Sequence, residues 1–404
     1  MKKSFKLIIT LFCLIITVSI FAGTNYYAVV DTGSSGSRLH MYKIETSNDN
    51  QFKAIDEIDI PHNKLNPGLS AMAGDKTQVV NYIKPLITAL TSALKAKNIP
   101  EKDVNFYLLA TAGMRVIAPS AQNSSYSAIT EYIKNNSNLK IGYIETIPGK
   151  YEGAFDFISI NYLLKNLSNK NATKGIIDMG GESVEIAFQT HQKLSNNNDI
   201  ITFKINNVIY RIYSKSYLGL GQDSVRGQYS NAPYCFPKGY LLPSGEYGNG
   251  DYEKCLKRLN SLINNVHEVD QANVKFPSIS EFIGLSGIYY IAGTPFDLGS
   301  EITIDHIIEK GKEFSKFSWK ELSDKYPDNQ YLYSVYINSA YIADLLSNGF
   351  GFEKNTPFKV YNKINGMSSD WTLGAAIFFN QNNYIQSLEK QTPVQKIEQK
   401  QKAG

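Results

Sequence analysis

The sequence predicts an α/β fold built from two similar lobes, and three observations carry this prediction. The length of 404 residues suggests two or three domains. Hydrophobic residues make up 43% of the chain and charged residues 19%, and the 27 Tyr and 20 Phe suit β-rich α/β lobes. Above all, residues 27–42 and 175–188 share one pattern, in which an apolar strand ends in aspartate and a turn of glycine and serine follows.

The repeated turn has the chemistry of an anion-binding loop. Asp31 ends the first strand before the turn 32–37, and Asp178 ends the second before the turn 180–183. Glycines let backbone N–H groups approach an anion, and serine hydroxyls add donors. An aspartate at the strand end can hold a hydrated cation beside that anion. One such turn is usually only a hairpin, but two copies indicate two lobes that face one polyphosphate.

The N-terminus predicts a cleavable secretory signal over residues 1–22. Three lysines precede an apolar run from Leu7 to Phe21, and Ala22 suits the position before a cleavage site. The run is short for a full membrane span, which favours cleavage over an uncleaved anchor. We therefore expect a secreted or periplasmic protein with no stable membrane insertion after signal removal.

Cysteine usage agrees with export. Cleavage would remove Cys13 and leave Cys235 and Cys255, which we expect to form a disulfide. On loop-entropy grounds this bond would stabilise the fold by about 3 kcal/mol. The alternative is a pair of free buried thiols.

Regular elements are expected along the rest of the chain from its apolar periodicity and its turn residues. The first half predicts an extended segment at 51–67, a helix at 78–98 bent at Pro85, a strand at 104–110, a helix at 125–134, a strand at 141–144 and an apolar helix ending near Leu164. The second half predicts a strand at 200–213, a glycine-rich loop at 217–223, a strand or strand-to-helix junction at 282–290, a helix at 330–347, an apolar run at 371–379 and a polar disordered tail at 391–404.

Three polar residues near these elements have two open interpretations each. Thr111 and Arg115 follow a buried strand, where α/β folds place ligand loops, but they could equally be a helix cap and a solvated charge. Glu152 precedes an apolar helix, where a carboxylate usually matches the helix dipole. Its position between the two glycine-rich turns makes a general base for water the functional alternative.

Other kinds of site find little support in the sequence. A net charge of +4 without a basic run gives no electrostatic case for nucleic acid. The chain has no Walker A lysine loop, no His-Glu-x-x-His helix and no Gly-x-Ser-x-Gly elbow. The five histidines show no metal-ligand spacing, and His40 is interpreted as a structural strand residue.

Five ordered motifs resemble the signatures of the ecto-apyrases, the nucleoside triphosphate diphosphohydrolase family of the actin/hsp70/sugar-kinase superfamily. They are VVDTGSSGSR from residue 29, LLATAGMR from 108, IPGKYEGAFDFISINYLL from 147, IIDMGGESVEI from 176 and FIGLSGIYY from 282. CFPKGY from residue 235 and DWTLGA from 370 also look familial. The leader and the polar tail resemble those of an exported bacterial member.

The resemblance implies two actin-like, ribonuclease H-like lobes with the active site in the cleft between them. It places lobe I at 24–148 plus 362–390 and lobe II at 149–361. It also implies hydrolysis of nucleoside tri- and diphosphates to the monophosphate with Ca²⁺ or Mg²⁺, by a monomer and without a phosphoenzyme.

The resemblance implies a role for each residue that matches a family motif. Phosphate binding falls to Ser34, Ser35, Gly36, Ser37, Gly180, Gly181, Glu182 and Ser183. The cation is expected at Asp31 and Asp178, largely through water, with Glu185 as a third candidate. Glu152 matches the catalytic glutamate that activates water, with Thr111 and Ser183 as positioning groups. Phe350 falls where the family places an aromatic that stacks on the base, although a core position at a helix end competes with that role.

Two departures from the family pattern keep other functions open. Glu185 stands where many apyrases have Gln, and a Glu here resembles the related exopolyphosphatases. Tyr151 replaces an acidic residue that is usual before the catalytic Glu. The alternatives are an exopolyphosphatase or guanosine tetra/pentaphosphate phosphatase, and a non-catalytic nucleotide-binding surface protein. Intact Asp31, Glu152 and Asp178 argue against the last of these.

Overall fold

The computed structural model describes residues 21–49, 51–167, 169 and 172–382. Most of the expected signal (residues 1–20), Cys13 and the tail 391–404 lie outside the described residues, as do residues 383–390 of the expected lobe I. The last two residues of the expected signal lie in the first strand, where Phe21 pairs with Ser47.

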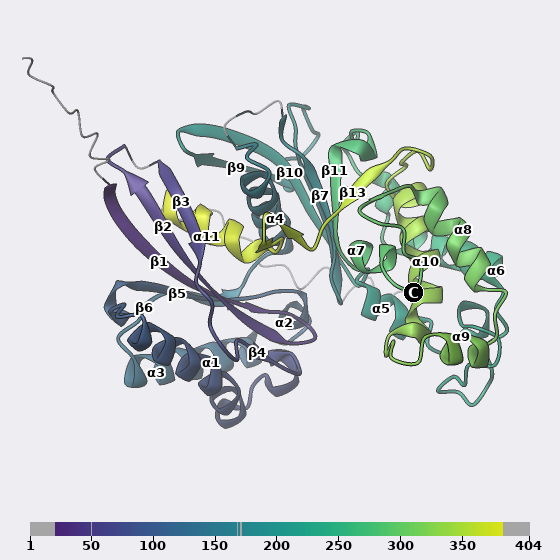
Figure 1. Ribbon diagram of the computed structural model, residues 1–404, viewed down its shortest axis with the longest axis horizontal. Helices are drawn as coiled ribbons and strands as arrows, with labels where there is room; N and C mark the ends of the chain where they lie inside the picture. Colours follow the sequence, from purple (N-terminus) through teal and green to yellow (C-terminus); the bar gives the residue numbers. More distant parts are fainter. Residues whose placement is uncertain (1–20, 50, 168, 170–171, 383–404) are drawn as a thin grey trace, which may run out of the picture.

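The first sheet has the strand order β3-β2-β1-β5-β6, with β4 paired to β2. β1 and β2 form an antiparallel hairpin, and β5 and β6 continue the sheet in parallel with β1. Helices α1 (Lys76–Ala96) and α3 (Pro119–Asn136) pack against one face of this sheet (Figure 1). The strands are β1 (Phe21–Thr32), β2 (Ser37–Ser47), β3 (Phe52–Glu57), β4 (Lys64–Leu65), β5 (Val104–Ala110) and β6 (Lys140–Thr146).

The second sheet has seven strands in the order β12-β13-β11-β7-β8-β10-β9. Its centre repeats the arrangement of the first sheet, because β7 and β8 form a hairpin and β11 pairs in parallel with β7. The strands are β7 (Gly175–Met179), β8 (Ser183–Gln189), β9 (Ile200–Ile205), β10 (Val208–Leu218), β11 (Phe282–Ser286), β12 (Glu301–Ile302) and β13 (Phe358–Val360).

Two buried helices, α4 (Gly149–Leu163) and α11 (Trp371–Gln381), lie between the sheets (Figure 1). They pack so closely that a methyl group on Gly374 would collide with the carbonyl oxygen of Phe155. Their core includes Val29 of the first sheet and Ile176 of the second. Apolar residues cover almost every face of both helices because a sheet or a helix lies on each side of them.

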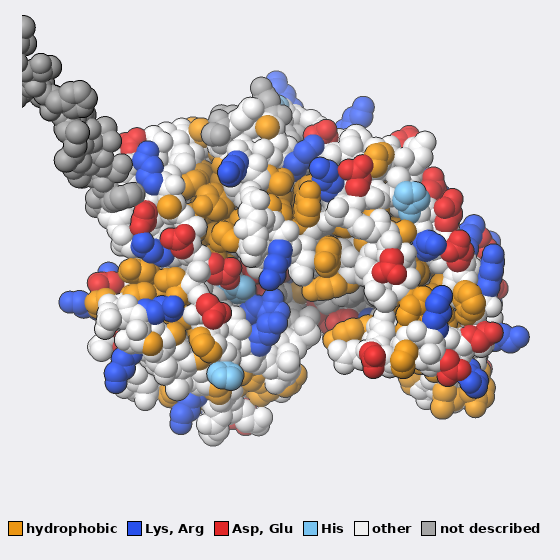
Figure 2. Space-filling model, in the orientation of Figure 1, with side chains coloured by type: hydrophobic (Ala, Val, Ile, Leu, Met, Phe, Trp, Pro, Cys, Tyr) orange, Lys and Arg blue, Asp and Glu red, His pale blue; other side chains and the backbone are white. Residues whose placement is uncertain are grey.

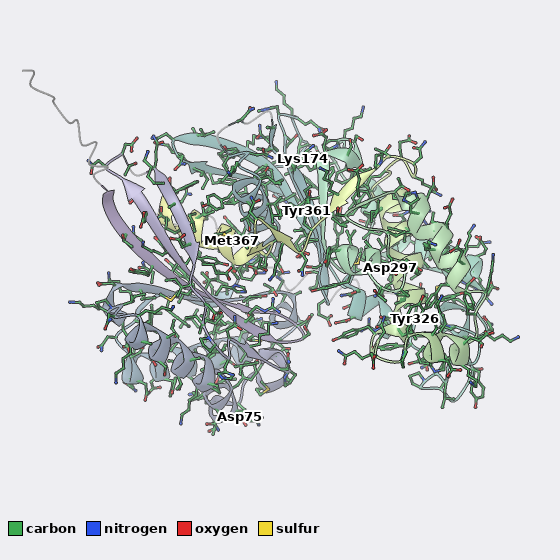
Figure 3. The ribbon with its side chains drawn as sticks, in the orientation of Figure 1. Asp75, Lys174, Asp297, Tyr326, Tyr361 and Met367 are labelled. Carbon is green, nitrogen blue, oxygen red and sulfur yellow. A yellow bond between two sulfur atoms is a disulfide. The ribbon has the colours of Figure 1, made fainter. Side chains whose placement is uncertain are left out.

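The segment that leads back to α11 leaves the second sheet after β13. The N–H of Tyr361 donates to the carbonyl of Gly284 at 3.1 Å, and a small hairpin follows. Tyr361 and Met367 mark this return in Figure 3. The hairpin consists of β14 (Lys363–Ile364) and β15 (Met367–Ser368).

The outer face of the second sheet carries a helical region (Figure 1). A disulfide joins Cys235 to Cys255 of α6 there, with Cα atoms 5.0 Å apart, so the expected pairing is present. The helices are α5 (Gln222–Gln228), α6 (Tyr252–Asn260), α7 (Gly287–Ala292), α8 (Ile304–Phe314), α9 (Trp319–Lys325) and α10 (Leu332–Asp344).

The structure corrects one predicted element and confirms the strand-to-helix interpretation of another. The single strand expected at 200–213 is the hairpin β9–β10, which turns at Asn206 and Asn207 with φ of 46° and 67°. Asparagine tolerates this left-handed region, so the turn interrupts a run that looks continuous by hydropathy. The 282–290 segment is strand β11 followed by α7. The expected lobe boundaries stay a prediction.

Candidate active site

The two glycine-rich turns meet each other in space. They connect β1 to β2 and β7 to β8, the corresponding hairpins of the two sheets. A methyl group on Gly181 would lie 2.6 Å from the Ser34 hydroxyl oxygen and 2.8 Å from a carboxylate oxygen of Asp223. Figure 2 shows a hollow between the two halves of the molecule, and α2 (Ala112–Arg115) and α5 lie on its two sides in Figure 1. The turns thus face one another, as a shared phosphate site requires.

Neighbouring segments hold each turn in place. The N–H of Thr111 donates to the carbonyl of Thr32 at 3.2 Å, which fixes the start of α2 beside the first turn. Tyr82 donates its hydroxyl to Ser37 at 3.0 Å, and Ser37 is buried. Ser34 and Ser35 keep more exposure, so they are the hydroxyls of this turn most open to a ligand.

The second turn rests on the glycine-rich loop 217–223. The N–H groups of Gln222 and Asp223 donate to the carbonyls of Gly180 and Gly181 at 3.0 and 2.8 Å. The N–H of Gly219 donates to the carbonyl of Glu182 at 2.8 Å. The sequence predicted only a glycine-rich loop here, whereas its amides set the shape of the turn.

Glu152 lies in the first turn of α4 and is paired with Arg115 of α2. The Arg115 Nη2 atom is 2.6 Å from Glu152 Oε2, and the Arg115 Nε atom donates to the carbonyl of Ile147 at 3.0 Å. The Glu152 side chain is 10% exposed and that of Arg115 is 12% exposed. Arg115 is therefore not a solvated surface charge, and Glu152 is more than a carboxylate that matches the helix dipole.

Glu185 links this ion pair to the second turn. Its Oε1 atom accepts hydrogen bonds from the hydroxyls of Ser183 at 2.7 Å and Ser216 at 2.6 Å, and it lies 3.7 Å from Arg115 Nη1. Burial and the nearby Glu152 charge raise the pKa of Glu185 well above its usual value. A continuous polar chain therefore runs from Ser183 to Glu152.

Three further acids, Asp31, Asp156 and Asp178, lie near this chain with too little positive charge to balance them. Burial, followed by repulsion from other acids, raises the pKa of Asp31 and Asp156 well above their usual value. Burial also raises the pKa of Asp178 to about 6, although a hydrogen bond from Ser286 lowers it. One or both carboxylate oxygens of these residues and of Glu185 are buried without a hydrogen-bond partner.

This acidic group fits a divalent cation in charge. A hard cation would neutralise the mutual repulsion and take oxygen ligands directly or through water. Between residues 21 and 382, apart from the gaps given above, no three His, Cys, Asp or Glu side chains are arranged to bind an ion directly.

Asp370 is an acid of this site that the sequence interpretation overlooked. It caps α11 by accepting the N–H of Thr372 at 3.0 Å, and its charge helps to raise the pKa of Asp31 and Asp178. His40 lies between Asp370, at 3.2 Å, and Glu57, at 2.8 Å. Burial lowers the pKa of His40, but these two carboxylates outweigh it, so the net shift is upward. His40 is buried on β2, in agreement with its interpretation as a structural residue, and it also anchors Asp370.

The expected stacking role of Phe350 does not agree with its position. Phe350 is 4% exposed, and its ring lies 5.4 Å from that of Phe276, 5.9 Å from that of Phe352 and 6.0 Å from that of Tyr217. Its π-face is therefore enclosed in the core, just after the π-helical turn Leu345–Gly349 that follows α10. The competing interpretation, a core residue at a helix end, is the one that the structure supports.

Comparison with known proteins gives a consistent result. A family profile described as GDA1/CD39 (nucleoside phosphatase) matches residues 21–235 and 240–397. The chain is 26% identical to the nucleoside-triphosphatase ntp-1 of Caenorhabditis elegans, over 92% of this chain and 77% of that protein. It is 28% identical to the Golgi apyrase of Schizosaccharomyces pombe, over 89% of this chain and 76% of that protein.

Solved structures extend the likeness to the fold. A nucleoside triphosphate hydrolase from Neospora caninum matches with a TM-score of 0.61 and 13% identity, over 88% of this chain and 92% of that one. A Ppx/GppA family member from Aquifex aeolicus matches with a TM-score of 0.54 and 15% identity, over 88% and 97%. At these identities the likeness concerns the fold alone, and it confirms the predicted α/β class with two actin-like lobes.

Proposed function

We propose that this chain, which belongs to the GDA1/CD39 (nucleoside phosphatase) family, hydrolyses nucleoside tri- and diphosphates to the monophosphate and phosphate. The observation that carries the proposal is the meeting of the two glycine-rich turns, with Glu152 connected to the second turn through Arg115 and Glu185. A water molecule between the turns and Glu152 would lose a proton to that carboxylate as it attacks the terminal phosphorus.

The turns supply the electrostatic part of the reaction. Backbone N–H groups of Ser34, Ser35 and residues 180–183, together with the hydroxyls of Ser34 and Ser35, would hold the phosphate oxygens as charge spreads over them. Preorganised donors of this kind usually contribute the largest part of the rate enhancement, because a loose phosphoryl transition state leaves little covalent chemistry to perform. Thr111 and Ser183 would position the attacking water.

Asp31 and Asp178 would hold a divalent cation, largely through its waters. When bound, Ca²⁺ or Mg²⁺ neutralises charge on the polyphosphate. The Glu185 Oε1 atom already accepts two hydrogen bonds, so Glu185 reaches an ion only with its other oxygen.

The nucleoside half of the substrate needs an aromatic partner other than Phe350. Tyr290 of α7 is 62% exposed, and α7 starts at Gly287, next to Met179 of β7 and to Gln222 behind the second turn. We propose Tyr290 as the ring that contacts the base.

A polyphosphate or guanosine tetra/pentaphosphate phosphatase is the second candidate, favoured by one residue. Glu185 carries a carboxylate where many apyrases have an amide, and Ppx/GppA proteins share the fold. Phosphate release from ATP, ADP, ppGpp and long-chain polyphosphate, each with Mg²⁺ and with Ca²⁺, decides between the two. Release from ATP and ADP is expected, and turnover of polyphosphate alone would show the proposal to be wrong.

The proposed location is the periplasm or the extracellular space. The Cys235–Cys255 disulfide supports an oxidising compartment. Among the helices of the described residues, none has the length and hydropathy needed to cross a bilayer.

A further inference from the structure

We infer that Arg115 is a positioning residue that orients the general base and couples it to the second phosphate-binding turn. This inference rests on the proposed function, because it assigns Arg115 a task in the same reaction. Three sides of its guanidinium are occupied by protein groups: the carbonyl of Ile147, the carboxylate of Glu152, and the Ser216–Glu185 pair. With those contacts made and 12% of the side chain exposed, Arg115 acts on protein groups rather than on solvent.

The geometry divides the two oxygens of Glu152 between two tasks. Oε2 is held 2.6 Å from Arg115 Nη2, within the range of a short charge-assisted hydrogen bond. The guanidinium is fixed in turn by the Ile147 carbonyl at 3.0 Å, so it fixes the position of this oxygen. Oε1 is left to accept the proton of the attacking water.

The same guanidinium reaches the phosphate-binding turn through Glu185. Arg115 Nη1 lies 3.7 Å from Glu185 Oε1, and that oxygen accepts the Ser183 hydroxyl at 2.7 Å. A shift of Ser183 as phosphate binds would therefore be passed to Glu152 through three contacts: Ser183–Glu185, Glu185–Arg115 and Arg115–Glu152. The Glu185 carboxyl group gives Arg115 a second acidic partner.

The start of α4 is shaped around this arrangement. A methyl group on Gly149 would lie 3.0 Å from Arg115 Nη1 and would collide with the side chain of Ser216. Glycine at this position thus leaves the space that Arg115 needs to reach Ser216 and Glu185. A Gly149→Ala variant disturbs the arrangement without removing a charge.

The test compares Arg115→Ala with Arg115→Lys, Gly149→Ala and the matched control Arg211→Ala. Arg211 lies on β10 and donates to the carbonyl of Thr190 at 3.1 Å, so its loss also removes a guanidinium bonded to the backbone. We expect Arg115→Ala to lower kcat for ATP by about 10²-fold with little change in KM, because only the orientation of the Glu152 carboxylate is lost. Arg115→Lys and Gly149→Ala should fall between wild type and Arg115→Ala.

Chemical rescue separates positioning from folding. Guanidinium ion, at concentrations far below those that unfold proteins, should restore part of the kcat of Arg115→Ala and leave Arg211→Ala unchanged. An increase in KM with kcat unchanged would show that Arg115 binds phosphate directly, and full activity of Arg115→Ala would remove its role. Absence of rescue in folded Arg115→Ala also overturns the inference. If Arg115→Ala does not fold, the decision passes to Arg115→Lys and Gly149→Ala. Unchanged kcat in both of these variants overturns the inference, and the expected loss of kcat supports it. Wild-type enzyme without phosphate release would instead refute the proposed function.

Discussion

The carboxylates of the candidate site are bound to their surroundings in different ways. Glu152 has an arginine partner at 2.6 Å, whereas Asp178 and Asp31 each keep a buried oxygen without a hydrogen bond. A guanidinium partner holds one oxygen of the carboxylate in place and leaves the other for the attacking water. Buried acids without such a partner gain most from a cation. This difference supports the proposal that Glu152 is the base and that Asp31 and Asp178 hold the cation.

Removing the base should affect chemistry more than binding. Glu152→Gln keeps the size of the side chain but cannot take the proton of the attacking water, so kcat should fall by about 10²–10⁴-fold. Affinity for a non-hydrolysable ATP analogue, measured by calorimetry, should change little. A variant that keeps wild-type kcat would show that another group activates the water.

The raised pKa of Asp178 predicts how stability depends on pH and on the cation. A carboxyl whose pKa rises from 3.8 to about 6 on folding binds its proton more tightly in the folded state. Its contribution to the free energy of unfolding is therefore greatest below pH 3.8 and is lost as pH rises through about 6, by about 3 kcal/mol. A cation that binds the ionised form should restore this loss.

Thermal unfolding with and without Mg²⁺ or Ca²⁺ checks this expectation. The increase in Tm on adding the cation should be larger at pH 7.5 than at pH 5, and Asp178→Asn should reduce the difference. An equal increase at both pH values in the wild type would contradict the assignment of Asp178 to the cation.

At the scale of the element, the close packing of α4 and α11 leaves no room for a side chain larger than that of glycine at their contact. Gly374 lets α11 approach the backbone of α4 at Phe155, so Gly374→Ala must push the two helices apart. We expect a loss of at least about 1–3 kcal/mol in unfolding free energy, measured by urea titration. Gly227→Ala in α5 is the matched control, because no atom lies within 4 Å of the added methyl group and the change should be neutral or stabilising.

The sequence predicted elements well where one periodicity or one strong turn signal decided them. The helix expected at 78–98 is found at 76–96, and the strand expected at 104–110 has those bounds. The β9–β10 hairpin was missed because Asn206-Asn207 is a weak turn signal inside an apolar run. For Phe350 the sequence left stacking and a core position both open, because a helix end can turn a ring toward either the core or the cleft.

The same limit holds for the candidate site. The two glycine-rich turns carry their chemistry in their own residues, so their roles could be proposed from spacing. Asp370, His40 and Arg115 take part only through contacts between segments far apart in the sequence, such as the 2.6 Å pair of Arg115 with Glu152. No local pattern encodes such contacts, and only the fold reveals them.

At the scale of the whole molecule, the disulfide should stabilise the outer helical region. Cys235 and Cys255 close a short loop, so reducing the bond should lower the free energy of unfolding by about 3 kcal/mol. Thermal melting with and without dithiothreitol measures this, and a Cys235→Ser/Cys255→Ser variant should not respond to the reductant. Identical melting of the wild type in both conditions would contradict the prediction.

The shared core around α4 and α11 has a consequence for cooperativity. Because Val29 and Ile176, from the two sheets, belong to one apolar cluster, neither half of the chain can lose its structure without exposing the interior of the other. A calorimetric scan should therefore show a single peak whose van 't Hoff and measured enthalpies agree, and either half expressed alone should be insoluble. The protein would be bilobal in shape and yet behave thermodynamically as one unit.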